Sequence, residues 1–176
     1  MDIEWKDFAN LPGTARVWIY GFENNLSSEV KNKVSETLAT FIPTWTSHQH
    51  RVTAAFTLVV NRFAIVAAYT SDGMSGCSID SLWRNIRGLE VNDELNPLDG
   101  SLLFFRDRNS QIQAVNREKF QQLVSSGDIK NNTPVFDTLI ENVGQLRAGK
   151  FERAFENCWH INMFNCEPNS TVKTAS

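Results

Sequence analysis

Cysteine is scarce in this chain of 176 residues, which contains only Cys77, Cys158 and Cys166. The odd number and the absence of any Cys-x-x-Cys pair exclude a disulfide-stapled scaffold and a paired-cysteine zinc site. The first residues, Met1 to Asp7, also lack the basic start and apolar core of a secretion signal. We therefore expect the protein to work in a reducing compartment, most simply the cytoplasm.

Long hydrophobic runs and a surplus of one charge are also missing. The longest apolar region, 54–69, is interrupted by Asn61 and Arg62 and is shorter than the roughly 20 residues that a membrane-spanning helix needs. The net charge is −3, the sequence pI is 5.6, and the basic residues form no run or stripe. Neither a membrane nor a nucleic acid is therefore expected as a partner.

Motifs for nucleotide and sugar chemistry are incomplete. The stretch from Gly144 to Lys150 matches Gly-x4-Gly-Lys, but Phe151 stands where a phosphate-binding loop needs Ser or Thr. That stretch also follows a helical pattern rather than a strand, and no pair of carboxylates is evident on a helix face. We therefore predict no nucleotide hydrolysis, no glycosidase chemistry and no cofactor.

What the sequence does contain is enough apolar material for a packed core. Hydrophobic residues make up 41% of the chain and aromatic residues 11%, so neither metal nor disulfides are needed for stability. We expect residues 1–166 to form a single domain. The polar residues 167–176 are expected to form a disordered tail.

Hydrophobic periodicity predicts an α+β fold. Alternating or β-branched runs predict strands, and helical spacing predicts helices, in the order strand 14–20, helix from Ser27 or Ser28 to Ile42, strands 52–60 and 63–69, helix 78–91 and strand 102–106. This β-α-β-β-α-β order is that of ferredoxin-like domains, in which an antiparallel sheet carries both helices on one face. An extra strand over 111–115 should form a hairpin with 102–106. A helical C-terminal region is expected over 116–127, 133–146 and part of 151–164.

The stretch from Thr70 to Asp80 joins a predicted buried strand to a predicted helix through a Gly-rich turn. Such a turn aims backbone N–H groups and the positive end of the helix dipole at one point, which favours the thiolate form of a cysteine. Cys77 is therefore a candidate nucleophile. The alternative is a structural cysteine, with Gly73 and Gly76 present for the backbone shape of the turn.

A thiol-dependent enzyme would also need a base and a group that orients it. We assign His48 as the base, with His50 and His160 as alternatives. Asp80 would orient that base or support the start of the helix.

The same histidines raise the question of a metal site. His48 and His50 share one face if their segment is extended, and Cys158, His160 or Cys166 could supply a third ligand. The paired spacings of known zinc sites are missing, however, so no metal is predicted. The alternative is a pair of loop histidines that hydrogen-bond to the backbone or to water.

Five short strings of the sequence together carry a resemblance. They are Ala15-Arg-Val-Trp-Ile-Tyr20, Trp45-Thr-Ser-His48, Asn61-Arg62-Phe63, Ser75-Gly-Cys-Ser-Ile-Asp80 and Trp159-His160. The chain resembles, over most of its length, a family of short uncharacterised bacterial proteins, some of which carry the label "ABC transporter ATPase". This sequence contains neither the phosphate-binding loop nor the ABC signature that such a label would require. The resemblance therefore implies no chemistry. It implies that the site is to be sought among Trp45, His48, Asn61, Arg62, Cys77, Asp80 and His160.

Our leading interpretation is a binding or interaction module for an unknown small molecule or protein, with a homodimer formed through an exposed sheet edge or face. Trp18, on the outer face of its strand with Arg16 and Tyr20, is a candidate for covering a groove or a partner surface. The alternative function is the thiol-dependent enzyme with Cys77 as nucleophile. The residues predicted to bind a ligand are Trp45, Asn61, Arg62, Ser75, Gly76, Ser78, Trp159 and His160.

Overall fold

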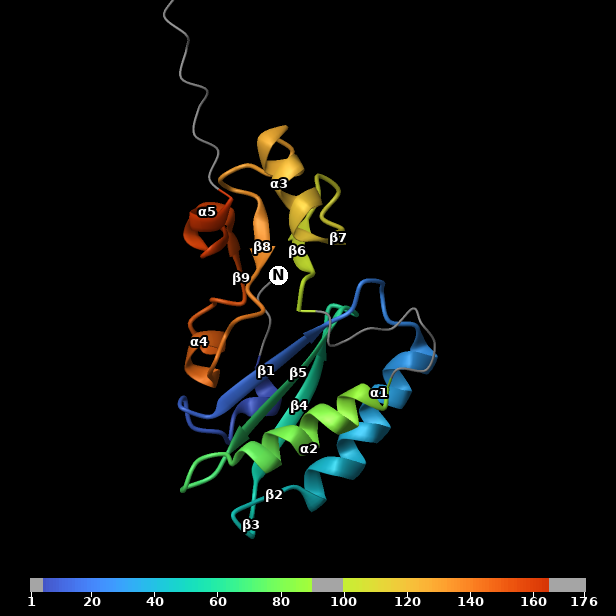
Figure 1. Ribbon diagram of the computed structural model, residues 1–176, viewed down its shortest axis with the longest axis vertical. Helices are drawn as coiled ribbons and strands as arrows, with labels where there is room; N and C mark the ends of the chain where they lie inside the picture. Colours follow the sequence, from blue (N-terminus) through green and yellow to red (C-terminus); the bar gives the residue numbers. More distant parts are fainter. Residues whose placement is uncertain (1–4, 90–99, 165–176) are drawn as a thin grey trace, which may run out of the picture.

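A computed structural model describes residues 5–89 and 100–164 (Figure 1). Helices and antiparallel sheets are both present, which confirms the α+β class. Within those two ranges, no helix is long and apolar enough to cross a membrane. Cys166 and the tail predicted over 167–176 lie outside the described residues.

The first sheet contains three antiparallel strands in the spatial order β1-β5-β4. They are β1 (Arg16–Gly21), β4 (Thr53–Val59) and β5 (Phe63–Tyr69). Two helices, α1 (Ser28–Phe41) and α2 (Gly76–Arg87), cover one face of this sheet (Figure 1). Strands and helices up to this point therefore follow the predicted ferredoxin-like order.

Local signals explain these elements. The Ser27 side chain accepts a hydrogen bond from the Val30 N–H at 3.2 Å and caps α1, as the sequence predicts. After Phe41 the chain continues as the 3-10 helix η2 (Ile42–Thr44), because Pro43 cannot extend an α-helix. Between β4 and β5, Asn61 adopts the positive φ of 56° that a tight hairpin needs.

A small ribbon follows η2 where the sequence indicates only a polar connection. It consists of β2 (Thr46–Ser47) and β3 (His50–Arg51), and it turns at His48 and Gln49. Both turn residues have positive φ, 50° and 67°, which suits a two-residue hairpin.

The second sheet has the order β7-β6-β8-β9, with all neighbours antiparallel. Its strands are β6 (Leu103–Arg106), β7 (Ile112–Val115), β8 (Pro134–Phe136) and β9 (Glu152–Ala154). The hairpin of β6 and β7 confirms the prediction. The remaining short elements are η1 (Lys6–Phe8), α3 (Arg117–Ser125), α4 (Val143–Arg147), η3 (Phe155–Asn157) and α5 (His160–Met163).

The ferredoxin-like arrangement is not completed, because β6 joins the second sheet instead of flanking β1. Phe104 and Phe105 explain this placement, since they are buried in two different core clusters on opposite faces of β6. A strand that is apolar on both faces is stable between two layers of a protein. The outer edge of β1 is instead approached by residues 141–143.

Two helix predictions need correction. The helix expected over 133–146 is wrong in its first part, because Pro134 to Phe136 form β8, and only Val143–Arg147 is helical. The apolar residues here have helical spacing, but residues 134–136 form a strand because β8 pairs with both β6 and β9. The helix expected over 78–91 begins at Gly76, capped by Ser75, and ends at Arg87, so Asp80 lies beyond its first turn.

A shared core joins the two sheets. The ring of Phe63 lies with its centroid 4.9 Å from that of Phe104 and 5.1 Å from those of Phe136 and Phe151. Gly21 makes this approach possible, because a Cβ there would lie 2.4 Å from the ring of Phe104. One core cluster therefore spans both sheets.

Candidate functional site

The first group of predicted residues meets where the β2–β3 ribbon packs on the start of α2. The Trp45 Nε1–H donates to the Ser78 carbonyl at 2.9 Å. The Ser47 hydroxyl accepts from the Ser75 N–H at 2.9 Å and donates to the Gly73 carbonyl at 3.2 Å. The Ser75 side chain in turn accepts from the Ser78 N–H at 3.2 Å.

These contacts make the start of α2 a structural joint. Trp45 is only 2% exposed, and its ring lies 5.0 Å from that of Phe41. The Ser75 N–H and the Ser78 N–H are both occupied by hydroxyl groups of the protein. The strings Trp45-Thr-Ser-His48 and Ser75-Gly-Cys-Ser therefore meet, and their hydrogen bonds fix the turn between β5 and α2.

The proposed catalytic residues lie on the surface beside this joint. Cys77 is the second residue of α2 and is exposed, as are Gly76, Asp80 and, at the tip of the ribbon, His48. Within residues 5–89 and 100–164, no hydrogen bond joins Cys77 Sγ to an imidazole. The roles of Cys77, His48 and Asp80 stay a prediction.

Asn61 and Arg62 lie at a junction instead. Arg62 is 6% exposed, and its guanidinium donates to Asn25 Oδ1 at 3.4 Å and to the Ile112 carbonyl at 3.1 Å. Burial lowers the pKa of Arg62 from its usual value. Because Ile112 belongs to β7, Arg62 ties the β4–β5 hairpin to the second sheet. Asn61 Oδ1 accepts from Lys31 Nζ at 3.2 Å.

Trp159 belongs to a second group, which is centred on Asp137 just after β8. The Trp159 Nε1–H donates to Asp137 Oδ1 at 3.0 Å, and the Arg153 guanidinium donates to Asp137 Oδ2 at 2.6 Å. Asp137 Oδ1 also accepts from the N–H of Leu139 at 3.0 Å. The carboxylate, 6% exposed, therefore fixes the turn that carries the chain out of β8.

His160, next to Trp159, is paired with a different cysteine from the one predicted. Its Nδ1 lies 3.0 Å from Cys158 Sγ. Burial lowers the pKa of His160 to about 4, and burial also raises the pKa of the Cys158 thiol. At neutral pH both groups are therefore uncharged, which does not suit a thiolate nucleophile. In the described part of the chain, no three His, Cys, Asp or Glu side chains are placed to hold a metal ion.

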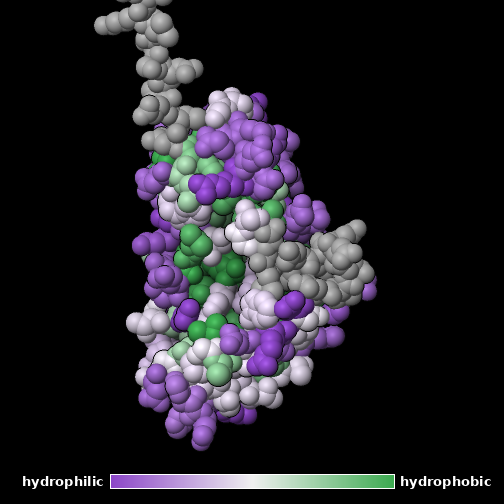
Figure 2. Space-filling model, viewed as in Figure 1, coloured by the Kyte–Doolittle hydropathy of each residue, from purple (hydrophilic) through white to green (hydrophobic). Residues whose placement is uncertain are grey.

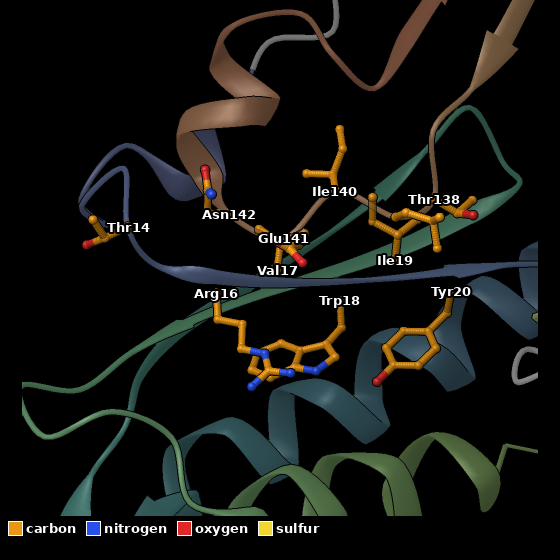
Figure 3. Close-up of a pocket in the computed structure, with 11 residues that line it drawn as sticks. Thr14, Arg16, Val17, Trp18, Ile19, Tyr20, Thr138, Ile140, Glu141 and Asn142 are labelled. Atoms are coloured by element: carbon orange, nitrogen blue, oxygen red, sulfur yellow. The ribbon is translucent and has the colours of Figure 1, made fainter. Parts of the chain in front are cut away.

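A pocket of about 570 Å³ lies along the outer edge of β1 (Figure 3). Its lining residues come from β1 and from the segment between β8 and α4: Thr14, Arg16, Val17, Trp18, Ile19, Tyr20, Thr138, Leu139, Ile140, Glu141 and Asn142. At one end the two segments are joined, because the Val17 N–H donates to the Glu141 carbonyl at 2.9 Å and the Val143 N–H to the Ala15 carbonyl at 3.0 Å. We call this pair of hydrogen bonds the clasp.

Beyond the clasp, the residues that the structure describes leave the edge of β1 open. Among the described residues, no strand and no backbone hydrogen bond occupies this edge from Trp18 to Gly21. Alternate residues of an antiparallel strand direct their N–H and C=O groups to the same edge. Because Val17 directs its N–H outward to Glu141, the N–H and C=O of Ile19 also face outward, into the pocket.

The side chains of β1 divide between the two sides of the pocket (Figure 3). Arg16, Trp18 and Tyr20 lie on the side of the helices, and the Arg16 guanidinium stacks 5.2 Å from the Trp18 ring centroid. Ile19 lies on the opposite side, toward the segment that carries Thr138. Burial raises the pKa of Tyr20, so its hydroxyl stays neutral at physiological pH.

The rim of the pocket carries an exposed apolar residue. Leu139 is 65% exposed, whereas Ile140 beside it is buried. Figure 2 shows apolar side chains gathered in a hollow on the same face of the molecule. The pocket thus combines unpaired backbone groups with an apolar wall.

The sequence did not predict this pocket, although one signal was present. The alternation over 14–20 indicates that Trp18 faces away from Val17 and Ile19, and Trp18 does line the pocket. Nothing in the sequence indicates that Leu139 or Glu141 would lie beside it. The importance of Asp137 and Arg153 was also missed.

Comparisons with known proteins found no matching family model, no matching curated protein and no matching solved structure. The resemblance to a family of short bacterial proteins therefore stays a prediction.

Proposed function

We propose that this protein is a binding module whose β1 edge takes up an extended peptide segment as an additional strand. The observation that carries the proposal is the outward N–H and C=O of Ile19, unpaired among the described residues and facing a pocket of about 570 Å³. An unpaired edge of this kind is a template for another strand. Peptide recognition by strand addition obtains its affinity from such main-chain hydrogen bonds.

The size and position of the pocket support this occupant. Its volume falls within the range of roughly 300–1,000 Å³ that ligand pockets have. The place beside β1 is also where a ferredoxin-like sheet would hold its fourth strand, which β6 does not supply here. A peptide in this place would extend the β1-β5-β4 sheet without moving either helix.

A peptide suits the open edge better than a second copy of the chain. The edge from Trp18 to Gly21 is about 13 Å long at the usual rise per residue. A stable dimer buries ~800 Å² on each partner, which needs a much larger surface. Symmetric pairing of two β1 strands about Ile19 would also place Val17 opposite Gly21, although Glu141 already holds the Val17 N–H.

A displayed library of random heptapeptides tests the proposal directly. We expect the immobilised protein to select peptides that bind in the micromolar range. A series of synthetic versions, each N-methylated at one amide, should then lose affinity at every second position, because only alternate amides face β1. A library that yields no binder, or binders insensitive to N-methylation, would overturn the proposal.

Substitutions at Ile19 provide a matched pair of variants. Ile19→Pro removes the outward N–H but leaves the ladder with β5, because proline is tolerated on the open side of an edge strand. Ile19→Val keeps the N–H. We expect Ile19→Pro to weaken peptide binding about tenfold or more, because the peptide loses its main-chain hydrogen bond to the Ile19 N–H and its own carbonyl is left unpaired. Ile19→Val should bind as the wild type does, and circular dichroism should show that both variants are folded.

The thiol-dependent enzyme is the second candidate. The exposure of Cys77 in the first turn of α2 favours it, since reactive cysteines are accessible and lie at helix N-termini. The missing hydrogen bond from an imidazole in the described part of the chain counts against it. Rapid alkylation of Cys77 that follows the titration of one nearby histidine would support this function, and labelling at the rate of an unstructured peptide thiol would remove it.

The scarcity of cysteine supports a reducing compartment such as the cytoplasm as the place of either function.

A further inference from the structure

We infer that the bound peptide carries a large aliphatic side chain at the position paired with Ile19, where it packs against Leu139. This inference rests on the proposed function and specifies its ligand. Main-chain hydrogen bonds do not distinguish one peptide sequence from another. Specificity must therefore come from side chains beside the edge of β1.

The direction of the Ile19 side chain determines which peptide residue meets Leu139. Directly paired residues of two neighbouring strands place their side chains on the same face of the sheet. Ile19 points to the side of the pocket formed by Thr138 and its neighbours (Figure 3). The peptide residue paired with Ile19 therefore points to the same side, while its two neighbours point toward Trp18 and Tyr20.

Leu139 is exposed and lies where a bound peptide would contact it. It is 65% exposed and lines the pocket, whereas the other large exposed apolar residues in the described part of the chain do not: Tyr69 at 39%, Trp83 at 42% and Met163 at 46%. Single exposed apolar residues are ordinary on protein surfaces. An exposed leucine beside unpaired strand groups differs from these, because a paired strand would cover it.

Asp137 holds Leu139 in place before any peptide binds. The carboxylate accepts the Leu139 N–H, and it is itself fixed by Arg153 and Trp159. A preformed apolar wall avoids the entropy that ordering a mobile loop would cost on binding. The cluster that contains Trp159 thus acts on the pocket through the turn that it fixes, which makes Asp137 a positioning residue.

The selected peptides give the first test. We expect an enrichment of Leu, Ile, Val or Met at one register position, and the amide of that same residue should be among those whose methylation is most harmful, because a residue paired antiparallel with Ile19 exchanges both backbone hydrogen bonds with it. Replacing that side chain by serine should weaken binding to the wild-type protein about tenfold, since a buried aliphatic side chain contributes this much or more. This measurement needs no variant of the protein, so the folding of a mutant cannot obscure it.

A protein variant gives the second test. Leu139→Gln should weaken the same peptides about tenfold. Met163→Gln, which also replaces an exposed apolar residue but lies outside the pocket, should change affinity less than twofold. The serine-substituted peptide should bind wild type and Leu139→Gln equally, because the contact is already lost.

The outcomes separate the two proposals. Binding that depends on peptide amides but shows no aliphatic preference and no effect of Leu139→Gln would overturn this inference and leave the proposed function standing. Failure of the library to yield any binder would overturn both. Equal effects of Leu139→Gln and Met163→Gln would also contradict the inference, since the loss would then come from general surface polarity.

Discussion

Nδ1 of His160 lies 3.0 Å from Sγ of Cys158, and both groups are buried. The ring of Phe120 lies 5.6 Å from the imidazole and helps to enclose it. Cys77, by contrast, is exposed at the start of α2. Two cysteines of one chain therefore occupy opposite environments, and their chemistry should differ accordingly.

Alkylation should distinguish these two thiols. In the native protein we expect Cys77 to react with iodoacetamide at least ~100-fold faster than Cys158, because Cys158 becomes accessible only when the structure opens locally. Mass spectrometry of peptic fragments assigns the label to each cysteine. In denaturant the two rates should become similar, and a fast native reaction at Cys158 would contradict its burial.

The buried imidazole should make stability depend on pH. The pKa of His160 is about 4 in the folded protein and near 6.5 in the unfolded chain. Between these values the unfolded state binds the additional proton, so the free energy of unfolding falls as the pH is lowered from about 6.5 toward 4. The expected loss is up to roughly 3 kcal/mol, and none of it arises above pH 7.

A variant without the imidazole isolates this contribution. His160→Gln should show a smaller decrease in unfolding free energy over the same pH range, measured by urea titration at each pH. Equal slopes for wild type and His160→Gln would show that His160 does not titrate as its burial requires.

Asp137 should contribute to the stability of the fold as well as to the position of Leu139. Asp137→Asn weakens the ion pair and leaves the partly buried Arg153 without its carboxylate, which should lower the free energy of unfolding by about 2–4 kcal/mol. Asp128→Asn is the matched control, because its pair with Arg108 is exposed and should contribute less than about 1 kcal/mol. Urea denaturation of both variants measures the difference, and similar losses would contradict the structural role of Asp137.

Gly21 should tolerate no side chain. In Gly21→Ala the new Cβ meets the ring of Phe104, so strands and core must shift at a cost of roughly 1–3 kcal/mol. Gly76→Ala places a methyl group where no atom lies within 4 Å, and we expect a change within about 0.5 kcal/mol or a small gain. Thermal unfolding of the two variants tests this contrast, and equal melting temperatures would contradict the close packing at Gly21.

The sequence predicts those elements that local signals determine. The helix predicted from Ser27 or Ser28 is capped by Ser27, and the helical region predicted over 116–127 is capped by Asn116 and followed by Gly127, whose φ is 76°. Asn61 turns the β4–β5 hairpin. In each case a residue type suits the local backbone: the cap residues accept backbone N–H groups at a helix start, and Asn or Gly adopts the positive φ of a turn or a helix end.

Features that depend on distant partners could not be predicted in the same way. Val135 and Phe136 have helical spacing with Leu139 and Ile140, but their pairing with β6 and β9 makes them a strand. The pocket likewise arises only because Glu141 meets Val17 across most of the chain. A single sequence states which residues are apolar, but it does not state which strand edges will meet.

The clasp between Val17 and Glu141 has a consequence for how the protein is made. Segments that are so distant in the sequence come together late in folding, because closing the long intervening loop costs conformational entropy. While the chain is still emerging from the ribosome, β1 can fold with β5 before residue 141 has been synthesised. During that interval the whole edge of β1 is uncovered, and a growing chain is then most exposed to strand-mediated aggregation.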